Sequence, residues 1–594
     1  MYTAPTQEMR FALDLAGLAK VSKLPGYEEA TPDLVDAVLD EAGKLASDVL
    51  EPLNHTGDKE GSRLENGVVY TPKGFKEAYR AFIDGGWNSV PFDPAHGGQG
   101  LPTLIHTALG ELWSAANFSF ALCPLLTFGA VEAIAVHGSA QQKALYLPKM
   151  ISGEWTGTMN LTEPQAGSDL ALIKTRAVRD GEHYRITGQK IFITYGDHDW
   201  TDNIIHLVLA RLPDAPAGTR GISLFIVPKM LVNPDGSLST RNDLRCVSLE
   251  HKLGIKASPT AVMAYGDSGG AIGYLVGEEN RGLGYMFTMM NHARLGVGLE
   301  GVSIAERAYQ QAREYAKQRV QSRDIAGDDP HPVTIIHHPD VRRMLLTMRS
   351  QTEAARALNY FTAAHLDIAK RHPEAAEREA TQHLVDLLVP VCKAWSTDLG
   401  VEVASLGIQV HGGMGYIEET GAAQHFRDAR IAPIYEGTNG IQANDLIGRK
   451  LGRDGGESAR RFLARMRAID KDLNAAESAD LSALAAPMRQ GLDALDGATA
   501  WMVGMLGKDM RHAAAGAVDY LRLFGTVAGG WSMACAAIEA AKRLRQGDEN
   551  ASFLKAKLLS ARFYADTVLA RAPALLHPIA HAGDTTMAFA EDQF

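Results

Sequence analysis

Cysteine is scarce in this sequence, which has 594 residues and four cysteines. Cys123, Cys246, Cys392 and Cys535 are isolated from one another, and no Cys-x-x-Cys pair indicates a zinc site or a redox dithiol. Free thiols in a reducing cytoplasm are the simplest interpretation. The first twenty residues also lack a basic start followed by an apolar core and a cleavage site, so we expect a cytoplasmic chain without a signal peptide.

Other missing features exclude further classes. No run of about 18 apolar residues is apparent, so the sequence predicts no membrane span. The net charge of −11 argues against a general nucleic-acid surface, although a local basic patch can hide in an acidic total. His337-His338 lacks spaced metal-ligating partners and is expected in a surface loop. The absence of a Gly-x-Ser-x-Gly elbow argues against a serine hydrolase.

What is present indicates a large globular protein, mainly α-helical with an inserted β domain. Apolar residues make up 46% of the chain and charged residues 22%, and the length predicts several domains. We expect an N-terminal extension over 1–38, a helical domain over 39–155, a β domain over 156–280, a helical bundle over 281–452 and a C-terminal helical domain over 453–594. A Gly-rich break, "GRDGGES", precedes the last domain, in which "FGTVAGGWSM" is expected to interrupt a helix pair.

Three stretches are candidates for function. Gly296–Gly301 spells G-x-G-x-x-G, but no convincing strand precedes it and the helical period runs through it, so close helix packing is the better interpretation. "TMNLTEPQAGSD" offers hydroxyl groups and an open glycine that suit a polar ring or a phosphate, or it is an ordinary turn. Glu436, in "IYEGTNGIQ", either favours a helix N-terminus capped by Thr438 or Asn439, or is a general base in a poorly solvated pocket.

Five motifs together decide between these alternatives. "MNLTEPQAGSD", "GQKIFIT", "AKQRVQSR", "QVHGGMGY" and "IYEGTNGIQ" stand in the order and at about the spacing found in the acyl-CoA dehydrogenase family, which the chain resembles over residues 39–451. The remaining segments resemble a long subfamily with an N-terminal extension and an added C-terminal helical domain. Within it, the likeness favours 3-methylmercaptopropionyl-CoA or a short- to medium-chain fatty acyl-CoA as substrate.

The resemblance implies bound FAD and an α,β-dehydrogenation of an acyl-CoA thioester to a trans-2-enoyl-CoA. Glu436 matches the family's base, which takes the α-proton while hydride passes to the flavin. Some relatives carry the base on an earlier helix, where this chain has Ala293. An electron-transferring flavoprotein is the implied electron acceptor, and a homodimer or homotetramer is implied because a neighbouring subunit contacts the FAD.

Further site residues follow from the resemblance. Contacts to the flavin or to the rest of FAD are implied for Met159, Leu161, Thr162, Ser168, Phe192, Thr194 and Thr438. Contacts to the FAD of a neighbouring subunit are implied for Arg319, Gln321, Gln409, Gly412 and Gly413. Substrate contacts are implied for Ser168, Asn291, Arg294 and Gly437, although Asn291 and Arg294 also suit a helix cap or a buried ion pair.

Two alternatives concern the C-terminal domain. Relatives with such a domain include flavin-bearing DNA-damage-response proteins, but acidic and basic residues are nearly balanced after Gly452, which argues against DNA binding. A purely structural role is the other alternative. The large apolar side chains there, such as Trp501, Met502 and Phe524, are expected in a packed core rather than around a ligand.

Overall fold

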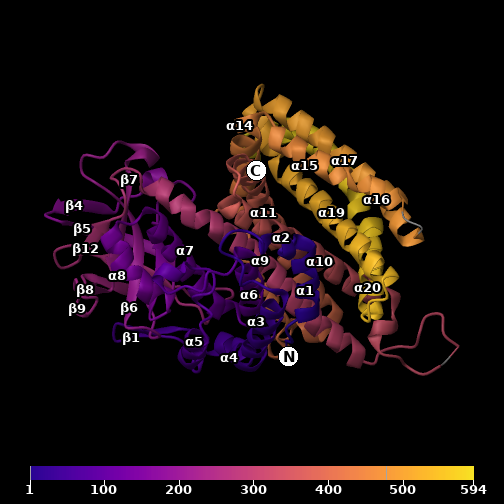
Figure 1. The fold of residues 1–594 in the computed structure, drawn as a ribbon, viewed down its shortest axis with the longest axis horizontal. Helices are drawn as coiled ribbons and strands as arrows, with labels where there is room; N and C mark the ends of the chain where they lie inside the picture. Colours follow the sequence, from indigo (N-terminus) through magenta and orange to yellow (C-terminus); the bar gives the residue numbers. More distant parts are fainter. Residues whose placement is uncertain (1, 329, 476–477) are drawn as a thin grey trace.

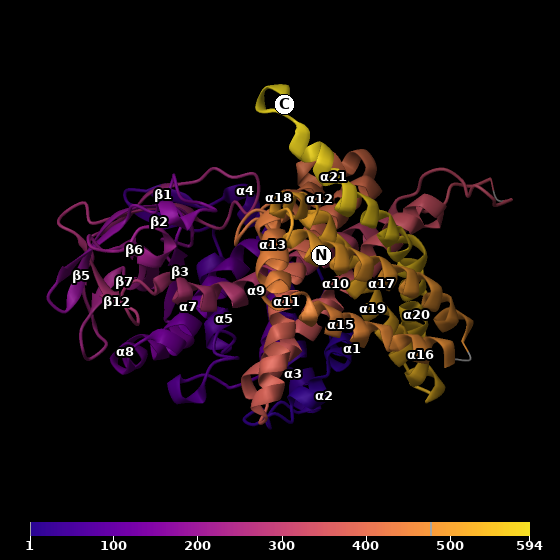
Figure 2. The same cartoon turned by 90° about the horizontal axis from the view of Figure 1, so that it is seen from above.

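The computed structural model describes residues 2–328, 330–475 and 478–594, and the side chains of Met289, Asn291 and Ala475 lie outside the description. Figure 1 shows the strands gathered at one side, long helices in the middle and the C-terminal helices at the other side. Figure 2, seen from above, shows α9 running from the β domain toward the helical core. The molecule is therefore a β domain and a C-terminal helical layer on opposite sides of one helical core.

The N-terminal part is helical, with one short hairpin that the sequence did not indicate. Its helices are α1 (Thr6–Ala16), α2 (Leu18–Val21), α3 (Pro32–Lys44), α4 (Glu51–Glu60), α5 (Phe75–Asp84), α6 (Thr103–Ala116), α7 (Phe118–His137) and α8 (Ala140–Ile151). The hairpin pairs β1 (Arg63–Glu65) with β2 (Val68–Tyr70). Thr31 caps α3, and a capping box at Ser139 begins α8, as both sequences favour.

The β domain contains an eight-stranded sheet in the order β10-β11-β5-β12-β7-β6-β3, with β4 paired to β5 and β6. Its strands are β3 (Trp155–Asn160), β4 (Arg176–Asp180), β5 (His183–Thr194), β6 (Asn203–Arg211), β7 (Ile222–Pro228), β10 (Leu244–Leu249), β11 (Thr260–Tyr265) and β12 (Ala271–Leu275), and β8 (Met230–Val232) pairs separately with β9 (Leu238–Arg241). Strand β7 is buried along its whole length, which fits its unbroken apolar sequence.

Three long helices form the core of the bundle: α9 (Gly282–Gln318), α10 (Pro339–Arg371) and α11 (Ala375–His411). The G-x-G-x-x-G stretch lies inside α9, as predicted. A Cβ at Gly298 would lie 2.8 Å from the Cys392 carbonyl oxygen, and one at Gly301 would lie 2.1 Å from the Ser396 carbonyl oxygen. The glycines therefore let α9 and α11 approach closely. Two short helices follow, α12 (Ala422–Ala429) and α13 (Asn439–Asp445), and a π-helical turn spans Leu446–Leu451.

The C-terminal helices cover this bundle. They are α14 (Gly452–Asp454), α15 (Glu457–Arg467), α16 (Ile469–Ala475), α17 (Ala479–Leu506), α18 (Met510–Ala515), α19 (Ala517–Arg545), α20 (Ala551–Thr567) and α21 (Leu576–Ala588). The prediction that "FGTVAGGWSM" interrupts a helix pair was wrong, because these residues lie within α19. Their glycines allow close contact, since a Cβ at Gly525 would lie 2.3 Å from the Trp395 ring.

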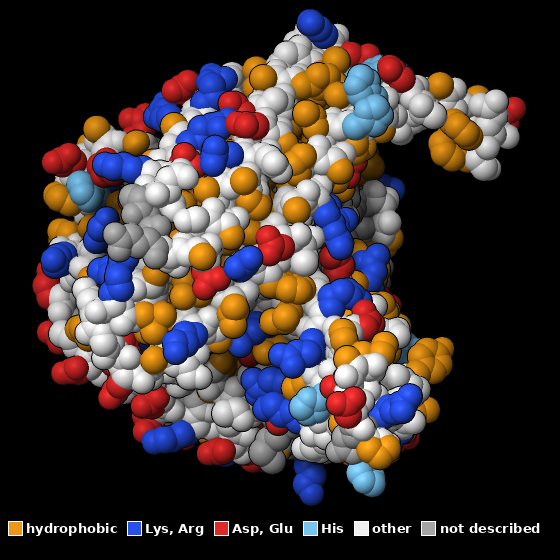
Figure 3. Space-filling view, turned by 90° about the vertical axis from the view of Figure 1, so that its right-hand side faces the viewer, with side chains coloured by type: hydrophobic (Ala, Val, Ile, Leu, Met, Phe, Trp, Pro, Cys, Tyr) orange, Lys and Arg blue, Asp and Glu red, His pale blue; other side chains and the backbone are white. Residues whose placement is uncertain are grey.

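The C-terminal domain packs as a core, as its apolar side chains predicted. Met502, Leu523 and Phe524 are fully buried. The N-terminal helix is tied to this layer, because Glu8 of α1 forms an ion pair with Lys557 of α20. On the face shown in Figure 3, Lys and Arg side chains are interspersed with Asp and Glu side chains. This mixed face differs from the single-sign surface that attracts nucleic acid.

Two helices of the described chain have the length and apolar composition to cross a membrane, namely α7 and α19. Neither helix contains a run of 18 consecutive apolar residues, since polar or charged residues interrupt both. In these two helices 72% and 83% of the most apolar window is buried inside the protein. This burial is typical of the core helices of a globular protein.

The packing of α9 on α11 predicts a specific cost for a small substitution. Gly301→Ala should lower the free energy of unfolding by at least about 2 kcal/mol, because the added methyl group overlaps the Ser396 carbonyl. Gly284→Ala in the same helix is the matched control, since a Cβ there meets nothing within 4 Å. It should be neutral or stabilising by up to about 1 kcal/mol. Denaturant unfolding measures both, and equal effects would contradict the packing.

Candidate active site

Glu436 lies in a strained loop before α13. Its φ angle is 53° and that of Gly437 is 81°, so two successive residues have the left-handed conformation. For a non-glycine residue this costs on the order of 1 kcal/mol or more, and such strain clusters at functional sites. Thr438 then caps α13 by accepting a hydrogen bond from the Ile441 N–H at 3.2 Å. Thr438 is therefore the helix cap, whereas Glu436 lies two residues before it with a conformation that capping does not require.

Three side chains hold the loop in this conformation. The Lys393 ammonium donates to the Gly437 carbonyl and to Asn439 Oδ1, both at 2.9 Å. The Gln442 amide donates to the carbonyls of Glu436 at 3.1 Å and Gly437 at 3.2 Å. Asn439 is fixed in turn, because its amide donates to Asp398 at 2.7 Å. None of these partners was identified from the sequence.

The surroundings of Glu436 act on its protonation in two opposite directions. Burial raises the pKa of Glu436, and the positive charges of Arg294 and Lys393 partly oppose this effect. Arg294 forms an ion pair of 3.2 Å with Asp445, and the side chains are 6% and 4% exposed. Arg294 therefore forms a buried ion pair with Asp445 and also places a positive charge near Glu436. Asn291 lies in α9, but its side chain is outside the description.

A second carboxyl group lies beside the base, and sequence reasoning missed it. Glu300, on α9, is 1% exposed and accepts a hydrogen bond from the Tyr435 hydroxyl. Its Oε1 has no hydrogen-bond partner among the described residues. Burial raises the pKa of Glu300, the Tyr435 hydrogen bond opposes this rise and the charge of Glu436 adds to it, so that the resulting pKa is about 8. Glu300 is therefore mainly neutral at pH 7.

A second cluster of predicted residues lies where β3 and β5 meet. Met159 and Leu161 belong to the same hydrophobic cluster as Ala293 of α9, the residue before Arg294. The Thr162 carbonyl accepts from the Ile191 N–H at 2.9 Å, and the Thr194 carbonyl accepts from the Thr158 hydroxyl at 2.8 Å. Met159, Leu161 and Ala293 thus belong to one apolar cluster, and α9 itself packs on β7 of the same sheet.

Phe192 is the unusual member of this cluster. It is 58% exposed, its φ angle is 59°, and the pairing of β5 with β11 shifts register at this point. Such a bulge redirects a side chain out of the sheet. The strand thereby presents an aromatic ring at the surface of the domain, where a flat apolar group can stack on it.

The loop after β3 is fixed by a buried ion pair that the sequence did not indicate. Lys190 of β5 lies 2.8 Å from Glu163, and their side chains are 0% and 3% exposed. Lys190 also donates to the Leu161 carbonyl at 2.9 Å. Burial alone would raise the pKa of Glu163, but Lys190 and further hydrogen bonds lower it to about 2. Ser168, farther along the loop, is exposed.

The third cluster lies at the other end of α9. Arg319 and Gln321 are exposed and hydrogen-bonded to each other at 3.2 Å. Gln409, Gly412 and Gly413 are exposed at the end of α11, and stacking of Tyr315 on His411 brings the two helix ends together. Arg294 and Arg319 are 25 residues apart in one helix, which places them about 37 Å apart. The structure therefore does not bring this cluster to Glu436 within one protomer.

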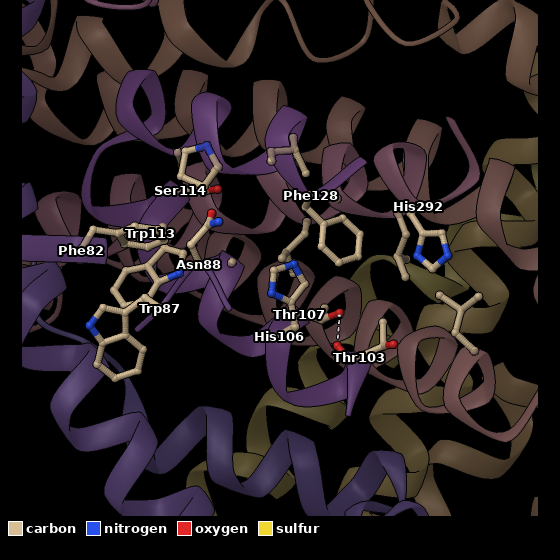
Figure 4. A pocket seen from close by; sticks show the side chains of 18 residues that line it. Phe82, Trp87, Asn88, Thr103, His106, Thr107, Trp113, Ser114, Phe128 and His292 are labelled. Atoms are coloured by element: carbon tan, nitrogen blue, oxygen red, sulfur yellow. Dashed lines mark hydrogen bonds between the residues drawn. The ribbon is translucent and has the colours of Figure 1, made fainter. Parts of the chain in front are cut away.

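A mainly apolar cavity lies beside α9, between α6 and α7. Its α9 lining includes Leu295, which follows Arg294, and Leu299, which precedes Glu300. Figure 4 shows Trp87 and Trp113 at one end and His292 at the other, with His106 and Phe128 between them. His106 stacks on Phe128 with ring centroids 4.6 Å apart. Burial and the nearby His292 lower the pKa of His106 to about 4, so its ring is neutral at pH 7.

Comparison with known proteins assigns this arrangement to a family. The models of the acyl-CoA dehydrogenase N-terminal, middle and C-terminal domains match residues 35–154, 158–267 and 280–451. The chain belongs to the acyl-CoA dehydrogenase family. A further family model, acetyl-CoA dehydrogenase C-terminal like, matches residues 462–590. The added C-terminal domain of this acyl-CoA dehydrogenase therefore also matches a known domain family.

Curated relatives cover nearly the whole chain. A 3-methylmercaptopropionyl-CoA dehydrogenase of Ruegeria pomeroyi is 50% identical over 99% of both chains. A butyryl-CoA dehydrogenase of Syntrophomonas wolfei is 36% identical over 90% of both. Among solved structures, Caenorhabditis elegans ACDH-11 in complex with C11-CoA shares the fold at 22% identity, with a TM-score of 0.76 over 93% of this chain and 90% of that one.

The buried ion pair of the active site predicts unequal effects for two arginines that both face Asp445. Arg294→Gln should lower the free energy of unfolding by about 3 kcal/mol, since it leaves a buried carboxylate poorly paired. Arg449, 3.3 Å from Asp445 with a side chain 65% exposed, is the matched control, and Arg449→Gln should cost less than about 1 kcal/mol. Denaturant unfolding compares them, and a larger loss for Arg449→Gln would contradict this assignment.

Proposed function

We propose that this FAD-dependent acyl-CoA dehydrogenase oxidises a short acyl-CoA, best represented by 3-methylmercaptopropionyl-CoA, with Glu436 as the base. The observation that carries the proposal is the half-buried Glu436 in a left-handed backbone, facing Arg294 and Lys393. The product is the trans-2-enoyl-CoA. The α-proton goes to Glu436, and the β-hydrogen leaves as hydride.

The described residues fit a flavin in this place. Phe192 offers an exposed ring on its bulge, and Met159, Leu161 and Thr162 lie beside it at the end of β3. Thr194 and Thr438 add hydroxyl groups on the two sides of the site. When bound, FAD supplies the hydride acceptor. The residues named above would hold its ring.

Glu436 acts through both its side chain and its backbone in this proposal. Its carboxylate removes the α-proton, and burial makes the carboxylate more basic. No hydrogen-bond partner of its backbone N–H occurs among the described residues, so this donor is free for the thioester oxygen. Such a donor stabilises the developing enolate by a few kcal/mol. Gly437 leaves room for the substrate.

The acyl chain is assigned to the cavity between α6, α7 and α9. The space open to the centre of a water-sized sphere is about 70 Å³, and one water needs about 10–15 Å³ on that scale. The cavity therefore suits a short chain of a few heavy atoms. A thioether sulfur gains from contact with aromatic rings, which Trp113 and Phe128 provide. The 50% identical relative named for 3-methylmercaptopropionyl-CoA supports the same choice.

The separation of the site residues along α9 supports a homo-oligomer. Arg319 lies about 37 Å from Arg294 along α9, and Gln321, Gln409, Gly412 and Gly413 lie at the same end of the bundle as Arg319, so we assign all five to the FAD of a second protomer. Their surroundings are apolar and exposed, with Tyr416 85%, Val320 50% and Met414 48% exposed. Exposed apolar side chains at one place are typical of an interface.

Three further assignments rest on the resemblance, on composition and on the exposure of a loop. We assign an electron-transferring flavoprotein as electron acceptor. The cysteines of the described chain are free thiols, which suits the reducing cytoplasm. We assign Ser168 to the CoA portion, since its exposed loop lies beyond the β3–β5 cluster.

Replacing the base tests the assignment of Glu436. Glu436→Gln should keep bound FAD but slow flavin bleaching by 3-methylmercaptopropionyl-CoA by at least about 100-fold, because the amide cannot accept the α-proton. Stopped-flow absorbance measures the rate. Glu419→Gln, which changes an exposed carboxylate of the same domain, is the control and should bleach at the wild-type rate. A Glu436→Gln enzyme that bleaches normally would eliminate this assignment.

A substrate panel tests the assignment of the cavity. With 3-methylmercaptopropionyl-, butanoyl-, octanoyl- and palmitoyl-CoA, kcat/KM for the first two should exceed that for palmitoyl-CoA by at least about 100-fold, since the cavity holds only a few heavy atoms. Trp87→Leu, which shortens the wall at one end, should raise kcat/KM for octanoyl-CoA. Preference for palmitoyl-CoA, or a Trp87→Leu enzyme with unchanged selectivity, would contradict the assignment.

A further inference from the structure

A buried lysine is the least expected group near the base. Lys393, in the middle of α11, is fully buried. A lysine in such a place loses its hydration, and a charged ammonium persists there only with hydrogen-bond acceptors and counter-charges. Its two hydrogen-bond acceptors belong to the base loop: the Gly437 carbonyl and Asn439 Oδ1, each at 2.9 Å.

We propose that Lys393 is a positioning residue of the reaction: its ammonium holds the Glu436–Gly437 backbone in the left-handed conformation and provides a counter-charge to the Glu436 carboxylate. The inference rests on the proposed function, in which Glu436 is the base. In this proposal Lys393 transfers no proton itself. It orients the Glu436 carboxylate and stabilises its charged form.

The first part of the argument is geometric. Two successive left-handed residues are unfavourable without external support. Lys393 and Gln442 both donate to the Gly437 carbonyl, at 2.9 and 3.2 Å. Lys393 also anchors Asn439, whose amide bonds the Ala394 carbonyl, Thr397 and Asp398 of the next turn of α11. The ammonium thus ties the loop to α11 at two points.

The second part is electrostatic and includes every charged group that faces Lys393. The base loop contributes Glu436, α9 contributes Glu300 and Arg294, and α11 itself contributes Asp398. Burial lowers the pKa of Lys393 to about 8, and the three carboxylates oppose this while Arg294 reinforces it. Burial also keeps Glu300 mainly protonated at pH 7, so that Glu436 is the principal negative charge left for the ammonium to balance.

The pH dependence follows from these directions. Flavin bleaching should rise with pH as Glu436 loses its proton. It should fall again above about pH 8, as Lys393 loses its own proton and releases the loop. Removing the ammonium takes away a charge that lowers the pKa of Glu436, so the rising limb moves to higher pH. A guanidinium stays charged throughout, so it removes the falling limb.

Two variants of the FAD-loaded protein test this inference by stopped-flow bleaching across pH. Lys393→Met, of similar volume, should slow bleaching about tenfold at pH 7 and shift the rising limb upward by about one pH unit. Lys393→Arg should keep the rising limb near its wild-type position and lose the falling limb. A rising limb that does not move in Lys393→Met, or a falling limb that persists in Lys393→Arg, would overturn the inference. If Lys393→Met does not fold, Lys393→Arg alone decides.

A readout independent of activity follows the loop itself. Amide hydrogen exchange of a peptide covering residues 430–445 should accelerate in Lys393→Met and not in Glu402→Gln, which changes an exposed carboxylate of the same helix and leaves both loop hydrogen bonds of Lys393 in place. Equal exchange in Lys393→Met and wild type would contradict the positioning role. If Glu436→Gln bleaches normally, the proposed function itself fails. If Glu436→Gln is inactive while both Lys393 variants retain the wild-type pH profile, only this inference fails.

Discussion

The active site depends on a backbone conformation that the chain does not favour. Glu436 and Gly437 are both left-handed, and the arrangement persists because Lys393 and Gln442 bind the two carbonyl groups from one side. Turning the carbonyls toward the bundle leaves the Glu436 carboxylate to face Arg294 on α9. The backbone conformation at Glu436 is thus set by side chains of α11 and α13 rather than by its own local sequence.

The long helices explain how distant parts of the chain act on one site. Helix α9 packs on β7 and carries Arg294 and Glu300 near Glu436 in its first half, while Arg319 follows its last residue, about 37 Å from Arg294. A helix of this length keeps Arg319 far from Glu436 within one protomer. The glycines of α9 let α11, which carries Lys393, pack closely against α9.

Much of the fold was predictable from the sequence, because long segments with a regular apolar period indicate their own secondary structure. β5 coincides with "HYRITGQKIFIT", and the helical period through Gly296–Gly301 identified α9 correctly. The glycine-rich part of α19 was misjudged, since only tertiary packing against Trp395 shows why glycines stand inside a helix. Ser, Thr and Glu residues interrupt the apolar helix α7, so its sequence contains no unbroken apolar run.

The active site was predictable only where a motif marks it. Glu436 and Thr438 stand in a motif, whereas Lys393, Glu300 and the Glu163–Lys190 pair lie far apart in sequence and meet only in the folded chain. The most direct measurement of the account's central claim is a crystal structure of the Glu436→Gln variant with FAD and 3-methylmercaptopropionyl-CoA. The account predicts that the substituted amide side chain lies within about 3–3.5 Å of the α-carbon, on the side opposite the flavin. A side chain turned away from that carbon, with another carboxylate in its place, would contradict it.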